Sequence, residues 1–171
     1  MESTRQNHQI FFGEFLGNCY MIILIPDVWS YELFEFYLPG SSWNPSEGIK
    51  ASTDFEFFHG RKDYASNCAG GYYASRLPII EYLNSIKRQA SVLVLRIETP
   101  SYWAGLGVWV VRESVRKALK KGAMKFADLK ETLESSRRIG KIKYNFDYES
   151  IFKQSKLLKQ IKTQRKLGEW E

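Results

Sequence analysis

The sequence has few cysteines and no hydrophobic run long enough to cross a membrane. Cys19 and Cys68 lie 49 positions apart, so we predict buried, reduced thiols and no disulfide framework. The longest apolar runs, near 20–25 and 92–95, are far shorter than the ~20 residues that span a bilayer. Charged and polar residues interrupt the first ten positions, as in a chain without a secretory signal. We therefore expect a cytoplasmic protein with no membrane partner.

Motifs for metals, phosphate-binding loops and nucleophilic catalysis are also missing. The four side chains best suited to zinc stand singly along the chain, without the close pairs of metal sites: His8, Cys19, His59 and Cys68. Neither GxxxxGK[ST] nor a GxGxxG after a strand occurs, and no local motif pairs a cysteine with a histidine. The sequence thus predicts no metal and no cofactor.

What is present is typical of a compact folded domain. Of the 171 residues 44% are hydrophobic, with 12 Gly and 5 Pro, which excludes disordered and collagen-like classes. Residues 1–111 carry 8 Lys/Arg and 11 Asp/Glu, whereas residues 112–171 carry 17 Lys/Arg and 8 Asp/Glu, a net charge of +9. This basic third either attracts phosphates and acidic partners or forms solvated helices rich in lysine.

Hydrophobic periodicity predicts a mixed α/β (α+β) fold. We expect strands at 9–16, 19–25, 53–59 and 91–97, the first two joined as a hairpin by Gly17-Asn18. Helical spacing predicts helices at 28–38, 63–87, 108–119, 126–133 and 148–161. The first half would supply a small central sheet and the second a basic helical part. Residues 1–161 would form one globular domain and residues 162–171 a short extended or 3₁₀ tail.

Two features inside these elements suggest close packing. Gly70-Gly71 lies in a predicted helix, where glycine costs about 1 kcal/mol relative to alanine, so we expect close backbone approach there, either for packing or for a ligand. Several arginines and glutamates lie beside apolar residues, and we expect an internal network of ion pairs among them: Arg76, Arg88, Arg96 with Glu98, and Arg112 with Glu113 and Arg116. An active site is the alternative interpretation of these charges.

Arg61, Lys62 and Asp63 form a candidate phosphate-binding corner between a predicted strand and helix. Unpaired backbone N–H groups at a helix start favour anions, although Asp63 alone as an N-cap also explains the pattern. Four lysines near the C-terminus are further candidates for contacts with nucleic acid or an acidic partner: Lys153, Lys156, Lys159 and Lys162.

The C-terminal residues Gln164, Leu167 and Trp170 are spaced three apart, so a 3₁₀ turn would align them on one edge. A terminal Trp implies a receiving pocket, in a partner or in the domain itself. The pattern Gln-x-x-Leu-x-x-Trp resembles the interaction box of the DNA polymerase sliding clamp (PCNA). Glu171 stands where such boxes commonly carry a second bulky apolar residue, so we expect an affinity on the order of micromolar.

Other segments resemble the Nre family of archaeal DNA repair proteins: HGRKDYA at 59–65, GYYASRL at 71–77, RQASVLVLR at 88–96 and GVWVVRE at 107–113. The resemblance runs from about Phe12 to the C-terminus. It implies a role in the response to DNA damage, with Gln164, Leu167 and Trp170 docking on the clamp. Members of this family are longer and begin with a cysteine-rich segment, so the chain resembles their C-terminal half, either as a truncated member or with a separate chain supplying the rest.

These observations give one leading function and two alternatives. The leading hypothesis is a repair accessory protein that binds DNA or a repair partner and is tethered to the clamp by its tail. The first alternative is an enzyme acting on nucleic acid or nucleotides with a divalent metal. Its phosphate binding and acid–base chemistry would come from a site around Arg61, Lys62 and Asp63, with Arg76 and Glu98. The second is DNA binding through the basic helices without any clamp role.

Overall fold

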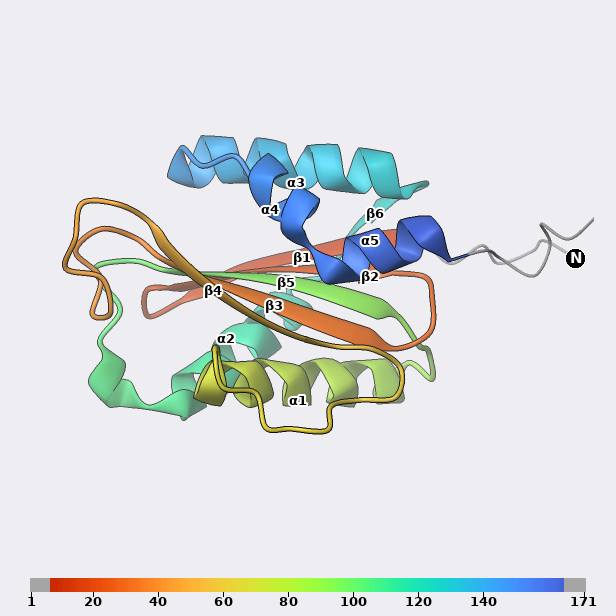
Figure 1. Cartoon of the computed structure of the whole chain (residues 1–171), viewed down its shortest axis with the longest axis horizontal. Coiled ribbons are helices and arrows are strands. Elements are labelled where there is room, and N and C mark those ends of the chain that lie inside the picture. The colour runs from red at the N-terminus through yellow and green to blue at the C-terminus, as the bar shows by residue number, and fades with distance from the viewer. Residues whose placement is uncertain (1–6, 165–171) are drawn as a thin grey trace, which may run out of the picture.

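A six-stranded mixed sheet forms the centre of the computed structural model, which describes residues 7–164. The strand order is β4-β3-β5-β2-β1-β6. The strands span β1 His8–Phe15, β2 Asn18–Ile25, β3 Ser30–Tyr37, β4 Lys50–Glu56, β5 Ser91–Glu98 and β6 Met124–Phe126. Helices cover both faces, α1 (Ala69–Ser85) and α2 (Val108–Lys120) on one, and α3 (Leu129–Tyr144), α4 (Glu149–Gln154) and α5 (Lys156–Thr163) on the other (Figure 1). The predicted mixed α/β fold is confirmed.

The predicted hairpin is confirmed as the antiparallel pair β1–β2, but its turn lies one residue earlier than predicted, because Asn18 already pairs with Phe15. Leu16 and Gly17 form the turn with φ values of 48° and 79°, the left-handed region that favours glycine. Gly17 also lies against the backbone of Tyr102, where a Cβ would come within 2.4 Å of the amide nitrogen. The turn is therefore fixed by a tertiary contact as well as by its sequence.

The helix predicted at 28–38 is wrong, because this segment forms the buried strand β3. β3 pairs in parallel with β5 and antiparallel with β4. Helices pack on both faces of the sheet at this point, so apolar residues are needed on both sides of the strand and its pattern no longer alternates. Consecutive buried apolar residues in a short strand mimic helical spacing.

Helix α1 begins six residues later than predicted, at Ala69 rather than Asp63. Asp63 is therefore not its N-cap. Residues 61–68 instead run as a loop along β4, where Oδ2 of Asp54 accepts hydrogen bonds from the backbone N–H groups of Asn67 (2.9 Å) and Cys68 (2.8 Å). A carboxylate from a neighbouring strand thus fixes the approach to the helix, which local sequence does not reveal.

Two predictions in the basic C-terminal part need correction. The segment at 126–133 is divided between edge strand β6 and the longer helix α3, which begins after the N-cap Asp128. The helix predicted at 148–161 is two helices separated at Ser155. Ser155 caps α5 by accepting from Leu158 N, and its hydroxyl donates to the buried carboxylate of Glu32 on β3. The break joins this helical layer to the sheet.

Each face of the sheet has its own hydrophobic core. Tyr20, Ile22, Leu33 and Val94 pack beneath α1 and α2, and side chains of the opposite register pack against α3, α4 and α5. Cys19 and Cys68 are both buried free thiols, as predicted. Among residues 7–164, no helix combines the length and the apolar character needed to cross a bilayer.

Candidate functional site

A buried polar cluster lies at the carboxyl ends of the parallel strands β3 and β5. The register places Glu35 beside Arg96 and Tyr37 beside Glu98, and these four residues share the sheet face that carries α1 and α2. Asn18, at the start of β2, lies opposite Glu98. In open α/β sheets, ligands bind beyond the carboxyl ends of parallel strands, so this is the position in the fold where a site is expected.

The guanidinium of Arg96 binds three neighbours at once. Its Nη1 donates to Oε1 of Glu35 at 2.6 Å, and its Nη2 lies 2.7 Å from Oε1 of Glu98. Nε and Nη2 also donate to Oδ1 of Asn18, at 2.9 and 2.7 Å. Arg96, Asn18, Glu35 and Glu98 are all buried. The carboxylates of Glu35 and Glu98 therefore share the single charge of Arg96. The second carboxyl oxygen of Glu98 accepts no hydrogen bond from any of residues 7–164.

This geometry shifts the ionisation of the cluster. Burial raises the pKa of Glu98 to about 7, against the opposing pull of Arg96 and with a further upward push from Glu35. Burial acts against the charge of Arg96, but Tyr20, Glu35 and Glu98 outweigh it, so its pKa is raised. Glu98 therefore exchanges a proton near neutral pH while Arg96 stays charged.

Two helix starts lie above the cluster and border an open hollow of about 400 Å³. Gly70 and Gly71 form the first turn of α1, and Gly107, with φ 75°, precedes α2. A Cβ at Gly70 would lie 3.0 Å from Val108 of α2, and one at Gly71 would overlap the carboxylate of Glu35. The prediction of close backbone approach at this Gly-Gly pair is confirmed.

Neither helix start has a side-chain cap. In α1 the first helical hydrogen bond runs from Tyr72 N to Cys68 O (2.9 Å), so the N–H groups of residues 69–71 precede the intrahelical ladder. Such N–H groups, together with the helix dipole, favour negative charge. The hollow thus has carboxylates on its sheet side and backbone donors on its helix side.

The predicted corner at Arg61, Lys62 and Asp63 borders a different hollow, of about 330 Å³. Arg61 lies 3.4 Å from Oδ1 of Asp54 and donates to the carbonyl oxygens of Phe55 (2.8 Å) and Asp63 (3.1 Å). Lys62 and Asp63 are exposed. Arg61 therefore holds the loop onto β4, and the opposite charges of Lys62 and Asp63 lie at the surface of this corner.

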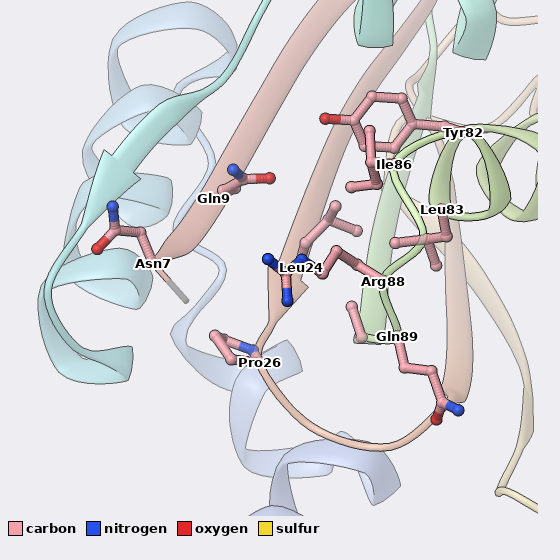
Figure 2. A pocket seen from close by; sticks show the side chains of 10 residues that line it. Asn7, Gln9, Leu24, Pro26, Tyr82, Leu83, Ile86, Arg88 and Gln89 are labelled. Carbon is pink, nitrogen blue, oxygen red and sulfur yellow. The ribbon is translucent and has the colours of Figure 1, made fainter. Parts of the chain in front are cut away.

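The predicted network of ion pairs is present in part. Arg96 with Glu98 and Arg76 with Glu56 (2.7 Å) form it, whereas Arg116 with Glu113 (2.8 Å) is a surface pair whose side chains are 37% and 41% exposed. For Arg88 and Arg112, no carboxylate among residues 7–164 lies within ion-pair distance. Arg88 instead borders a surface hollow of about 290 Å³, and Figure 2 shows its side chain together with those of Gln9 and Tyr82 around that hollow.

The basic lysines and the tail fall at the end of the described chain. Lys153, Lys156, Lys159 and Lys162 on α4 and α5 are all exposed; Lys153 pairs with Glu149 at 3.0 Å, and the amine of Lys156 lies 4.0 Å from the ring centre of Phe55. Gln164 ends α5 in extended backbone (φ −72°, ψ 116°) and is exposed. Leu167 and Trp170 lie outside the described residues.

Sequence reasoning missed most of the central cluster. Glu35 and Tyr37 were hidden in the segment mistaken for a helix, and Asn18 was assigned only to a turn. Trp43, which lines the hollow and is 61% exposed, lies in a loop with no local motif. The sequence did contain one signal for this cluster. Arg96 and Glu98 are charged residues in a segment whose other residues are typical of a buried strand.

The fold and site define a mixed α/β domain with a polar hollow at the ends of its parallel strands. Comparison with known proteins gives its family. The archaeal Nre C-terminal description matches residues 56–170 and the Nre N-terminal description matches residues 2–44. The chain belongs to the archaeal Nre family, and the similarity is not confined to the C-terminal part of that family. No solved structure matches the chain.

Three curated relatives illustrate the similarity. The chain is 43% identical over 114 residues to the DNA repair protein NreA of Haloferax volcanii and 44% identical over 129 residues to NreA of Archaeoglobus fulgidus, alignments that cover 66% and 75% of this chain. It is 36% identical over 167 residues, 98% of its length, to the DNA repair protein NreB of Archaeoglobus fulgidus. It spans 27%, 32% and 41% of the lengths of these three relatives.

Proposed function

We propose that this protein acts in DNA repair and docks on the sliding clamp through Gln164, Leu167 and Trp170. Membership of the Nre family and the names of its relatives, DNA repair proteins NreA and NreB, support the repair role. The spacing of the three tail residues supports the docking mode. The observation that carries the proposal is that this pattern begins at the surface, on a residue that has already left the helix.

The end of α5 favours a tail that is presented to a partner. Leu157 and Leu158 are buried against the sheet, whereas Thr163 and Gln164 are exposed. Gln164, Leu167 and Trp170 fall within seven residues, a segment that spans at most about 25 Å when extended. This length is sufficient for docking, because a box of this kind presents its binding side chains along one short segment. A tethered tail also raises the local concentration of the domain at DNA.

Titration against a purified sliding clamp tests the docking proposal. We expect micromolar binding of the full chain, and a loss of at least tenfold for Leu167→Ala and for Trp170→Ala, because buried aromatic and aliphatic anchors dominate small interfaces. Lys166→Ala, between the anchors, is the matched control and should bind within twofold of the unchanged chain. Equal binding by all variants and by a chain ending at Gln164 would refute the proposed docking.

The exposed lysines of α4 and α5 are proposed to contact DNA phosphates. Replacing all four lysines by Gln should weaken binding to DNA and flatten its dependence on salt, because each phosphate contact contributes about 0.7–0.9 to the slope of log K against log salt. Lys153 should contribute least, since Glu149 already pairs with it. A control variant changes to Gln four exposed lysines elsewhere: Lys87, Lys120, Lys121 and Lys125. An equal loss of DNA binding in this control would show that the effect comes from net charge and not from the lysines of α4 and α5.

A further inference from the structure

The hollow above Arg96 has the composition of a ligand site. Its volume of about 400 Å³ falls in the range of small-molecule pockets. It lies at the carboxyl ends of β3 and β5, where α/β folds place ligands. Neither Arg61 nor Gln164, the first residue of the proposed box, lines it, so ligand binding in the hollow does not depend on the proposed docking.

Glu98 supplies the strongest indication of what enters. The residue is 1% exposed and lines the hollow, yet its Oε2 accepts no hydrogen bond from any of the described residues. A buried carboxyl oxygen without a donor is costly. Four of the five N–H groups of Arg96 are directed at Glu35, Asn18 and the other oxygen of Glu98, and none of its nitrogens donates to Oε2. A ligand that donates a hydrogen bond would satisfy Oε2.

Trp43 supplies an aromatic surface in the same hollow. The residue lines the hollow but is 61% exposed, although its loop is held in place. Asn44 Nδ2 donates to the carbonyl oxygen of Tyr37 at 2.7 Å, and Ser42 Oγ donates to that of Tyr102 at 2.9 Å. An exposed indole on an anchored loop is suited to stacking on a flat ring, and stacking is the main way in which proteins hold unpaired bases.

The helix side of the hollow complements this arrangement. The uncapped starts of α1 and α2 present backbone N–H groups, including those of Gly70 and Gly71, which suit a phosphate. A free phosphate alone does not account for the site, because the carboxylates of Glu35 and Glu98 border the same space and repel a second anion. A ligand with a donor group and a flat ring at one end and a phosphate at the other fits both sides.

We propose that this hollow binds a nucleotide whose base carries an exocyclic amino group, with the amine donating to Oε2 of Glu98 and the ring stacking on Trp43. Such a base comes either from a free nucleotide or from an unpaired position in single-stranded DNA. Thymine lacks an amino group, and its single ring N–H is flanked by two carbonyl oxygens that would face the carboxylates. The site therefore discriminates against thymine.

Binding is tested with the full chain at fixed ionic strength. The probes are dCMP and dTMP, followed by tryptophan fluorescence, and fluorescein-labelled ten-residue oligonucleotides of dC and of dT, followed by anisotropy. We expect the cytosine probe to bind about tenfold more tightly than the thymine probe. Binding of dCMP by itself would identify a free nucleotide as the source, and binding of the dC oligonucleotide alone would identify unpaired DNA.

Three variants locate the site. Glu98→Gln, which retains size and shape, should reduce the cytosine preference to within twofold, and Trp43→Ala should weaken both oligonucleotides about tenfold. Tyr64→Ala removes a 71% exposed aromatic residue from the hollow at Arg61 and should change neither. Circular dichroism verifies that each variant is folded. Absence of binding by every probe, absence of a preference for cytosine, or unchanged binding by folded Glu98→Gln and Trp43→Ala would overturn the proposal.

Discussion

Replacing Glu98 by Gln should make the protein more stable at neutral and alkaline pH. Burial raises the pKa of Glu98 from the ordinary value of 4.5 to about 7, so the folded chain holds this proton more tightly than the unfolded chain does. Below about pH 4.5 the carboxyl is protonated in both states and its ionisation contributes nothing. Between pH 4.5 and 7 the unfolded state releases the proton first, and stability falls as the pH rises.

The magnitude follows from the size of the shift. A rise from 4.5 to about 7, at about 1.4 kcal/mol for each pH unit, corresponds to about 3 kcal/mol. The glutamine side chain of the Glu98→Gln variant has no proton to release, and its amide oxygen can still accept from Arg96, whose charge Glu35 continues to balance. The free energy of unfolding of Glu98→Gln minus that of the unchanged chain should therefore increase by about 3 kcal/mol between pH 4.5 and pH 8.

Urea denaturation at half-unit steps from pH 4.5 to pH 8 measures this difference. Glu47→Gln, at an exposed position, is the matched control and should give a difference that does not vary with pH. The reasoning is refuted if Glu98→Gln also shows a constant difference, or if it is the less stable protein at pH 8. A constant difference would mean that the folded chain ionises Glu98 well below neutral pH, and a less stable variant at pH 8 would mean that the lost contacts of the carboxylate with Arg96 outweigh the cost of its ionisation.

Two further substitutions test the packing around the site and the helical layer opposite. Gly71→Ala places a Cβ on the carboxylate of Glu35 and should lower the free energy of unfolding by about 2 kcal/mol, whereas Gly48→Ala, with no atom within 4 Å of the new Cβ, should not lower it. Ser155→Ala removes both the cap of α5 and a donor to buried Glu32 and should lower it by about 2 kcal/mol in the same urea assay; an unchanged midpoint would contradict that role.

The local pattern of apolar and polar residues was sufficient to predict secondary structure in segments whose conformation depends on neighbouring residues in the sequence. The β1–β2 hairpin follows from two apolar runs around Gly17-Asn18, and the amphipathic pattern of 108–119 gave α2 nearly to its ends. It failed for β3, because a strand covered by helices on both faces has no alternation to read. It also failed at Ser155, where a hydrogen bond to Glu32, 123 positions away, interrupts the helix.

The candidate site shows the same division. Arg96 and Glu98 were recognisable as paired charges because they stand in an otherwise apolar strand, and Gly70-Gly71 as a point of close approach. Their partners were not recognisable, because Asn18, Glu35 and Trp43 come from three other segments that only the sheet order brings together. The Arg61 corner was predicted from its charges and from a helix start at Asp63, but the helix begins at Ala69 and folding pairs that arginine with Asp54.

The amino-acid sequence by itself determined the fold class, the hairpin, the reduced thiols and the resemblance to Nre proteins, since these depend on composition, short-range periodicity and local motifs. Only the tertiary structure decided that β3 and β5 run in parallel at the centre, and that one oxygen of Glu98 has no donor among residues 7–164 beneath two helix starts. The physical reason is that burial and partners set the state of a charged group, and both are properties of elements far apart in the chain.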